Sequence, residues 1–187
     1  MKRVAFFRNV NLGQGRSPTK PQLEAAFLAA GAALPQSFQT NGTVVFVADD
    51  ARAAEAIVGR ACALLREMTG LSEPAYVVDL PHLAALVEND PFAGIDREGV
   101  FDFSATFLPS AALAKLRAPL ASPRGDLEIV RVTEYVALSV SRRVGVSIGN
   151  ATLFLEKMLG VPATTRGWGT ITRLVRKAHL SGNSCVG

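Results

Sequence analysis

The dipeptide Asn41-Gly42 restricts the fold of this chain more than any other feature of its sequence. It separates two short segments with the composition of β-strands, residues 36–40 and 43–48. Asn-Gly between two such segments is the strongest local signal for a β-hairpin, because both residues tolerate the positive φ angles of a tight turn. The sequence therefore predicts two antiparallel strands joined at this dipeptide.

The segments on either side of the hairpin complete a known pattern. Residues 4–7 form the short, continuous apolar run of a strand that is buried on both faces. A first helix begins with a capping box, and a second begins with an aspartate cap. The two helices and the fourth strand are expected from Thr19 to Gly31, from Asp49 or Asp50 to Gly70, and from 75 to 80. The order strand-helix-strand-strand-helix-strand is that of a split βαβ, or ferredoxin-like, unit.

The second half of the chain repeats this order. Its elements are expected at 101–108 (strand), 111–120 (helix), 127–132 and 135–141 (strands), and 150–159 (helix). A last helix is expected to begin with Thr164 or Thr165 as its cap. We predict an α+β protein of two ferredoxin-like halves (α/β plaits) packed together, with a C-terminal helix. Residues 1–90 form the first half, 91–99 a linker, and 100–187 the second half with the C-terminal helices.

The charge of the chain is basic at both ends and acidic in the middle. Residues 1–48 carry a net charge of +4, residues 49–150 carry −4, and residues 151–187 carry +4. If the fold brings the two ends together, they form one electropositive surface that suits an anionic partner. The alternative is that scattered Lys and Arg residues only keep the protein soluble.

The predicted topology gathers polar side chains at one end of the first sheet. The first strand and the strand before the hairpin run parallel through a right-handed crossover, so the loop after residue 7 faces the hairpin turn. This loop and turn carry a guanidinium and several carboxamides, and the start of the last helix adds N–H groups that favour anions. We predict an electropositive cleft between the halves that binds a small phosphate- or carboxylate-bearing ligand through Arg8, Asn9, Asn11, Asn41, Thr165 and Arg166.

No recognisable catalytic or metal-binding pattern appears in the sequence, so a binding protein is favoured over an enzyme. The two histidines, His82 and His179, have no matching nucleophile or acid pattern nearby. The two cysteines, Cys62 and Cys185, have no metal-ligand spacing. We expect no catalytic residue, no metal and no cofactor. No apolar run approaches the ~18 residues of a membrane span, so we expect a cytoplasmic protein with no membrane partner and leave its oligomeric state open.

Two other function classes stay open. Ferredoxin-like sheets can present aromatic side chains to single-stranded nucleic acid, and a steep fall of affinity with salt would identify that class. The first strand lacks the basic and glycine spacing of such a sheet, and Phe6 and Phe7 have the pattern of core residues. The third class is a protein-interaction or structural module, in which an exposed apolar patch matters more than Arg8 or Arg166.

Three stretches together resemble an uncharacterised bacterial family, the domain of unknown function 1697 family. They are FFRNVNLG near the start, FQTNGTVVF at the hairpin and VPATTRGW before the last helix. Family members typically show L-R-G-I-N-V-G-G, Q-S-G-N-V-V-F and T-T-R-N-W at these places. The chain departs from that pattern at Asn9, Asn41, Thr43 and Gly167. The resemblance extends from Val4 to about Leu180 and implies two ferredoxin-like halves, but it implies no activity because none is assigned to the family.

Overall fold

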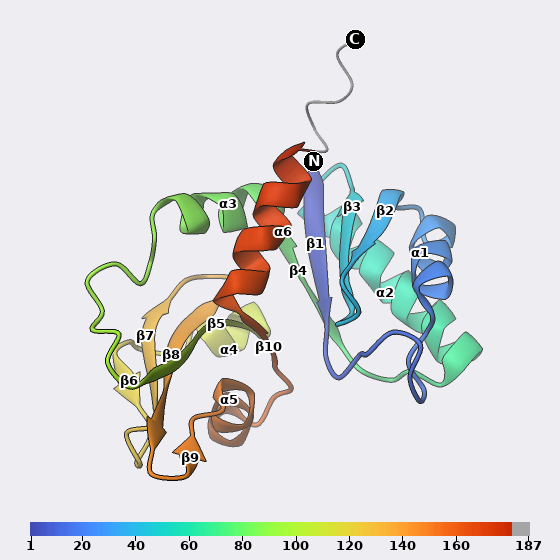
Figure 1. Cartoon of the computed structure of the whole chain (residues 1–187). Coiled ribbons are helices and arrows are strands. Elements are labelled where there is room, and N and C mark those ends of the chain that lie inside the picture. Colours follow the sequence, from blue (N-terminus) through green and yellow to red (C-terminus); the bar gives the residue numbers. More distant parts are fainter. Residues whose placement is uncertain (181–187) are drawn as a thin grey trace. The chain divides into compact units, whose positions relative to one another are not determined.

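The computed structural model describes residues 1–180, with side chains described up to Ala178. The chain divides into two compact units, Met1–Leu83 and Ala84–Gly187, and each is described here by itself (Figure 1). The division falls inside helix α3 (Leu80–Glu88). The predicted domain boundary, a linker at residues 91–99, stays a prediction.

The first unit has the element order that the sequence predicts. Its elements are β1 (Lys2–Phe7), α1 (Lys20–Ala29), β2 (Ala33–Phe38), β3 (Thr43–Val47), α2 (Ala51–Thr69) and β4 (Ala75–Asp79). The four strands form one sheet in the order β2-β3-β1-β4, in which every neighbouring pair is antiparallel (Figure 1). The hairpin between β2 and β3 is present as predicted, but its connection spans residues 39–42, and Gln39 and Gly42, not Asn41, take the positive φ angles.

Local capping explains where the two helices of this unit begin and end. Thr19 caps α1 in a full capping box with Gln22, so two N–H groups of the first turn find partners. The Asp50 side chain accepts a hydrogen bond from the Ala53 N–H at the start of α2. Gly70 ends α2 with a φ of 75°, a left-handed conformation that favours glycine. These predicted caps are confirmed.

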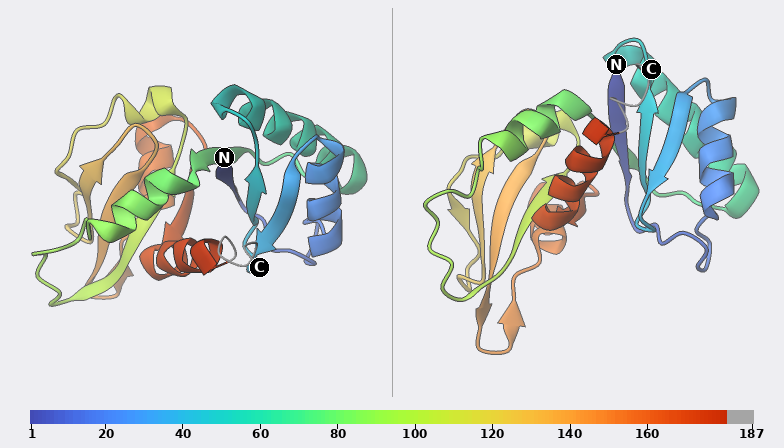
Figure 2. Two further views of the ribbon diagram at one scale, coloured as in Figure 1. Left: turned by 90° about the horizontal axis from the view of Figure 1, so that it is seen from above. Right: turned by 45° about the horizontal axis from the view of Figure 1, so that its top comes forward.

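The core of the first unit lies between the sheet and the two helices. Helices α1 and α2 cover the same face of the sheet (Figure 2). On that face the Phe27 ring meets the rings of Phe7 and Phe46 edge to face, with centroids 6.1 Å and 5.2 Å away. The side chains of residues 4–7 are fully buried, as the apolar run predicts.

The second unit contains a longer sheet. Its elements are β5 (Val100–Phe107), α4 (Ser110–Leu113), β6 (Leu120–Ala121), β7 (Leu127–Val132), β8 (Ala137–Val144), β9 (Ser147–Ile148), α5 (Ala151–Leu159), β10 (Thr164–Gly167) and α6 (Trp168–Leu180). The strands follow the order β10-β5-β8-β7-β6, and β9 pairs with β8. All neighbouring strands of the sheet are antiparallel.

Each face of this second sheet has its own apolar cluster. On one face, Leu113 of α4 and Leu155 of α5 pack in a core with Ile129 of the sheet. On the opposite face, the Phe92 ring lies between the rings of Phe103 and Trp168, with centroid distances of 4.7 Å and 5.2 Å. Phe92 therefore anchors the segment after α3 and the start of α6 to the sheet.

Two predicted elements of the second unit differ from the structure. The helix predicted at 111–120 is only one turn long. After Ala114 the backbone hydrogen bonds join residues that are three apart instead of four, and Leu120–Ala121 pair with β7 as a strand. The helix start predicted at Thr164 or Thr165 is wrong, since residues 164–167 form strand β10 against β5. Helix α6 begins only at Trp168.

The described residues thus form an α+β protein with two antiparallel sheets and six helices. None of these helices combines the length and the apolar character that a membrane crossing requires.

The Asp126 carboxylate ties the turn before β7 to β9 and should make the second unit sensitive to acid. It accepts hydrogen bonds from Ser147 Oγ at 2.6 Å and Ser122 Oγ at 2.7 Å. These bonds hold the pKa of Asp126 below its ordinary value of 3.8. The bond from Ser147 has the largest effect, and the charge of Arg124 adds a smaller one. The stabilisation is complete above that ordinary value and is lost as the pH falls through the lowered pKa of the folded protein.

We therefore expect acid to reduce the free energy of unfolding less in Asp126→Asn than in the wild type. Urea unfolding at neutral pH and at a series of pH values below 3.8 measures this difference. The other carboxylates titrate in both proteins, so their contribution to the loss of stability is the same and cancels in the comparison. Equal losses of stability would show that these hydrogen bonds do not favour the ionised carboxylate.

Candidate functional site

The loop after β1 is joined to the hairpin turn by backbone hydrogen bonds. The Phe7 N–H donates to the Gly42 carbonyl at 2.8 Å, and the Leu12 N–H donates to the Thr40 carbonyl at 2.7 Å. The Arg8 N–H donates to the Pro74 carbonyl at 3.0 Å, which fixes the other side of the loop. The predicted approach of the first loop to the hairpin is therefore present within the first unit.

Two residues of these segments adopt a left-handed backbone conformation without being glycine. Asn9 has a φ of 50° in the loop, and Gln39 has a φ of 58° before the hairpin turn. Asn is among the few residues that tolerate this region, whereas the family pattern has Gly at the position of Asn9. The departure at Asn9 thus keeps the backbone turn and adds a carboxamide at the same point.

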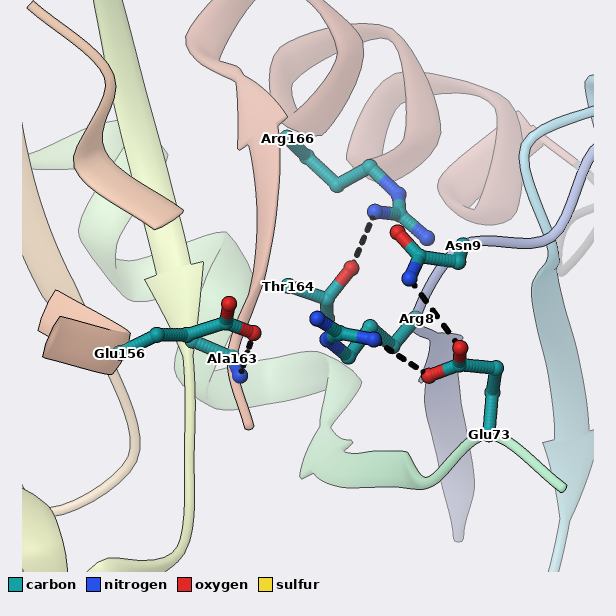
Figure 3. Close-up of polar contacts among 7 residues, drawn as sticks. All are labelled: Arg8, Asn9, Glu73, Glu156, Ala163, Thr164 and Arg166. Carbon is teal, nitrogen blue, oxygen red and sulfur yellow. Dashed lines mark hydrogen bonds and ion pairs between the residues drawn. The ribbon is translucent and has the colours of Figure 1, made fainter. Parts of the chain in front are cut away.

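Arg8 and Asn9 both donate to one carboxylate (Figure 3). Arg8 Nη1 lies 2.7 Å from Glu73 Oε2, and Asn9 Nδ2 lies 3.1 Å from Glu73 Oε1. Each donor bonds to a different oxygen of the Glu73 carboxylate. We call this arrangement of the Arg8 and Asn9 side chains the fork. The side chains of Arg8 and Glu73 are 24% and 28% exposed, so this arrangement lies at the surface and is partly screened by water.

The other two candidates of the first unit make local hydrogen bonds. Asn11 Nδ2 donates to Gln14 Oε1 at 2.7 Å, and the Asn11 N–H donates to Ser17 Oγ at 3.1 Å, so this side chain shapes the loop. Asn41 Oδ1 accepts from Thr43 Oγ1 at 2.8 Å. Asn41 and Thr43 are two of the departures from the family pattern, and here they bond to each other.

In the second unit, Thr165 and Arg166 lie on opposite faces of β10, because successive residues of a strand alternate. Thr165 Oγ1 shares hydrogen bonds with Thr106 Oγ1 at 2.8 Å and Thr152 Oγ1 at 2.7 Å, which joins α5 to the sheet. Arg166 pairs in register with Ala105 and so faces the other way. Arg166 therefore lies on a strand that precedes α6 and belongs to no helix face.

Arg166 is 8% exposed and is held by its own strand. Its Nη1 donates to Thr164 Oγ1 at 2.7 Å and to the Thr165 carbonyl at 3.0 Å (Figure 3). Burial lowers the pKa of Arg166 to about 10, because the charged form loses water contacts. On the segment before β10, the Ala163 N–H donates to Glu156 Oε1 at 2.9 Å, which fixes the approach to the strand (Figure 3).

The candidate residues of the first unit offer hydrogen-bond donors to an anion. They include no nucleophilic side chain and no general base. Among the side chains described, those of residues 1–178, no group of three His, Cys, Asp or Glu residues could hold a metal ion. The convergence of Thr165 and Arg166 with the first-unit residues in one site stays a prediction. No sequence motif points to Glu73, which is the direct partner of both Arg8 and Asn9.

Comparisons with known proteins give a family and a fold. A family model described as "Protein of unknown function (DUF1697)" matches residues 1–137. Among solved structures, the chain is similar to "conserved bacterial protein SP0830 from Streptococcus pneumoniae", with a TM-score of 0.66 and 15% sequence identity over 95% of this chain and 98% of that one. At this identity the likeness concerns the fold alone. No curated protein matches the chain.

Proposed function

The chain belongs to the DUF1697 family of proteins of unknown function, and from that premise we propose that it binds a small carboxylate- or phosphate-bearing ligand in the cytoplasm. The observation that carries this proposal is the fork of Arg8 and Asn9 around Glu73. A guanidinium and a carboxamide that donate to separate oxygens of one carboxylate have the arrangement needed for an anionic group. Glu73 occupies this position in the protein itself, and a ligand anion would replace it.

Backbone hydrogen bonds support the proposal by holding the fork in place before any ligand arrives. The loop is fixed at Phe7, Arg8 and Leu12, so little ordering is required on binding. The net charge of +4 in residues 1–48 also favours the approach of an anion. The roles proposed for Asn11, Asn41, Thr165 and Arg166 remain predictions that single variants test.

The finer fold assignment is part of the same proposal. We propose that both units are ferredoxin-like. The order β2-β3-β1-β4 in the first unit supports this, since a split βαβ unit places its first and third strands in the middle of the sheet. The order β10-β5-β8-β7 supports the same assignment in the second unit, with β6 as an added edge strand.

Glu73→Gln is the most informative variant, because it removes the internal competitor and keeps the size of the side chain. We expect this variant to bind inorganic phosphate or citrate about three- to tenfold more tightly than the wild type. The ligand then no longer has to displace a partly exposed ion pair, and this factor corresponds to the free energy of such a pair. Arg8→Gln should weaken binding of the same anions. Isothermal titration calorimetry measures both changes.

Glu67→Gln is the matched control, since Glu67 is exposed on α2 and its replacement changes the net charge equally. If Glu73→Gln and Glu67→Gln alter anion affinity to the same extent, the fork is not the binding site. Binding of single-stranded oligonucleotides alone, with affinity that falls steeply with salt, would favour the nucleic-acid alternative. Binding of neither class would leave the protein-interaction module as the better description.

A further inference from the structure

The first unit also contains a cavity that belongs to a different part of the fold. It has a volume of about 380 Å³ and is bounded by the turn after α1, by β2, by the end of β3 and by the first half of α2. Cavities of this size accept small-molecule ligands. Seven of its nine lining residues are Gly, Ala, Val or Ile, and the other two are Asp49 and Arg60. Asp49 and Arg60 are thus the two charged residues of an otherwise apolar lining.

Arg60 is fixed at one side of this cavity. Its Nε and Nη2 donate to the Ala30 carbonyl at 3.0 Å and 2.6 Å, so the guanidinium closes the C-terminal end of α1. The Arg60 Nη2 also lies 3.6 Å from the point where a side chain on Gly31 would begin. Neither bond uses Nη1, which donates to no residue within the described part of the chain. The Arg60 guanidinium is thus held in place, and its Nη1 is left as a donor for a ligand.

Asp49 occupies a defined place at the start of α2. The neighbouring Ala48 exchanges hydrogen bonds with Met1, since the terminal ammonium donates to the Ala48 carbonyl at 2.8 Å and the Ala48 N–H donates to the Met1 carbonyl at 3.1 Å. Asp50, which follows, caps α2. Among the side chains of residues 1–178, the Asp49 carboxylate forms no ion pair with Arg60 or with any other residue. Two opposite charges therefore line one cavity without neutralising each other.

We propose that this cavity binds a zwitterion, an α-amino acid with a small apolar side chain. The ligand carboxylate accepts hydrogen bonds from Arg60, and the ligand ammonium donates to Asp49. The apolar side chain packs on the alanines of α2, where its burial adds to the affinity. A simple anion meets the Asp49 charge and a simple cation meets the Arg60 charge, so only a ligand with both charges satisfies the pair.

The test compares L-valine with two analogues that each lack one charge, isobutyrate and isobutylamine. Binding is followed by two-dimensional amide NMR on the full chain, with the lining residues as reporters. We expect L-valine to shift the amides of Gly31 and Ala53 saturably, and both analogues to bind at least about tenfold more weakly, as the loss of a charged hydrogen bond implies. Asp49→Asn should weaken L-valine binding by a similar factor, and the exposed control Glu55→Gln should not.

Arg60→Gln also removes the hydrogen bonds to Ala30, so a second variant is needed that leaves both charges in place. Ala56→Leu serves this purpose, because Ala56 lines the cavity on an exposed position of α2 and leucine narrows the space. We expect Ala56→Leu to reduce L-valine binding without loss of thermal stability. The proposal is overturned if L-valine leaves the lining amides unshifted, or if isobutyrate binds as tightly as L-valine. It does not depend on the fork of Arg8 and Asn9.

Discussion

Gly42→Ala is expected to destabilise the first unit by about 2–4 kcal/mol, from backbone strain together with overpacking. Gly42 has a φ of 67°, which alanine adopts only with strain. A Cβ atom at this position would lie 2.6 Å from Val10 Cβ and 2.9 Å from Phe7 Cβ. Both neighbours are buried, so neither can move into solvent. The hairpin turn and the first loop would have to separate.

The free energy of unfolding in urea measures this effect, and amide exchange of β1 and β3 shows whether the loss is local. Gly13→Ala is the matched control, because Gly13 has a φ of 79° and no atom within 4 Å of the added Cβ. The control carries the backbone strain alone and should cost about 1–2 kcal/mol. Equal costs for the two variants would show that the loop and the hairpin turn can separate freely, which would weaken the proposed anion site as well.

The position of Glu73 beside Arg8 and Asn9 follows from the pairing of β1 with β4, but no sequence motif marks it. Strands β1 and β4 pair with Phe7 opposite Ala75, and this register, continued past the strand ends, places Asn9 opposite Glu73. The sequence predicts both strands and their antiparallel relation, so the pairing could be extended to the flanking residues. What the sequence lacks is the register itself, because a shift by one residue would turn Glu73 to the other face.

The misassigned segment at Thr164 shows the limit of local signals. A threonine before an amphipathic stretch is a typical helix cap, and the stripe through Trp168 and Ile171 does form α6. The residues before it pair with β5 over four positions, a contact with residues about sixty positions earlier in the chain. Thr is a β-branched residue that suits a strand equally well, so tertiary pairing decided the outcome.

Capping and turn chemistry were predicted best, because these interactions span only a few residues. Thr19, Asp50 and Gly70 occupy the cap positions expected of them. The place of Arg166 in a strand could not be predicted in this way, since it depends on the pairing of β10 with β5. The approach of the first loop to the hairpin turn thus follows from the sequence, whereas the hydrogen-bond partners of the candidate residues follow only from the three-dimensional pairing.

Asp79→Ala is expected to destabilise the first unit by about 3–5 kcal/mol, because it leaves a buried charge without its partner. Arg3 is only 3% exposed, and its Nη1 forms an ion pair with Asp79 Oδ1 across the β1–β4 pairing. Arg3 Nε is buried without a hydrogen-bond partner among the described residues, so the guanidinium depends on Asp79. Loss of the carboxylate would force Arg3 either to stay buried as an isolated charge or to open the sheet edge.

The double variant Arg3→Met/Asp79→Leu separates the cost of an orphaned charge from the value of the pair. Buried ion pairs are often replaced by apolar residues without loss of stability, so we expect the double variant to recover most of what Asp79→Ala loses. Lys20→Ala is the surface control, since Lys20 is 58% exposed and pairs with Glu24 at 3.8 Å. It should cost no more than about 0.5 kcal/mol. If Asp79→Ala costs as little as Lys20→Ala in urea unfolding, Arg3 reaches solvent without its partner, and the pair serves register rather than stability.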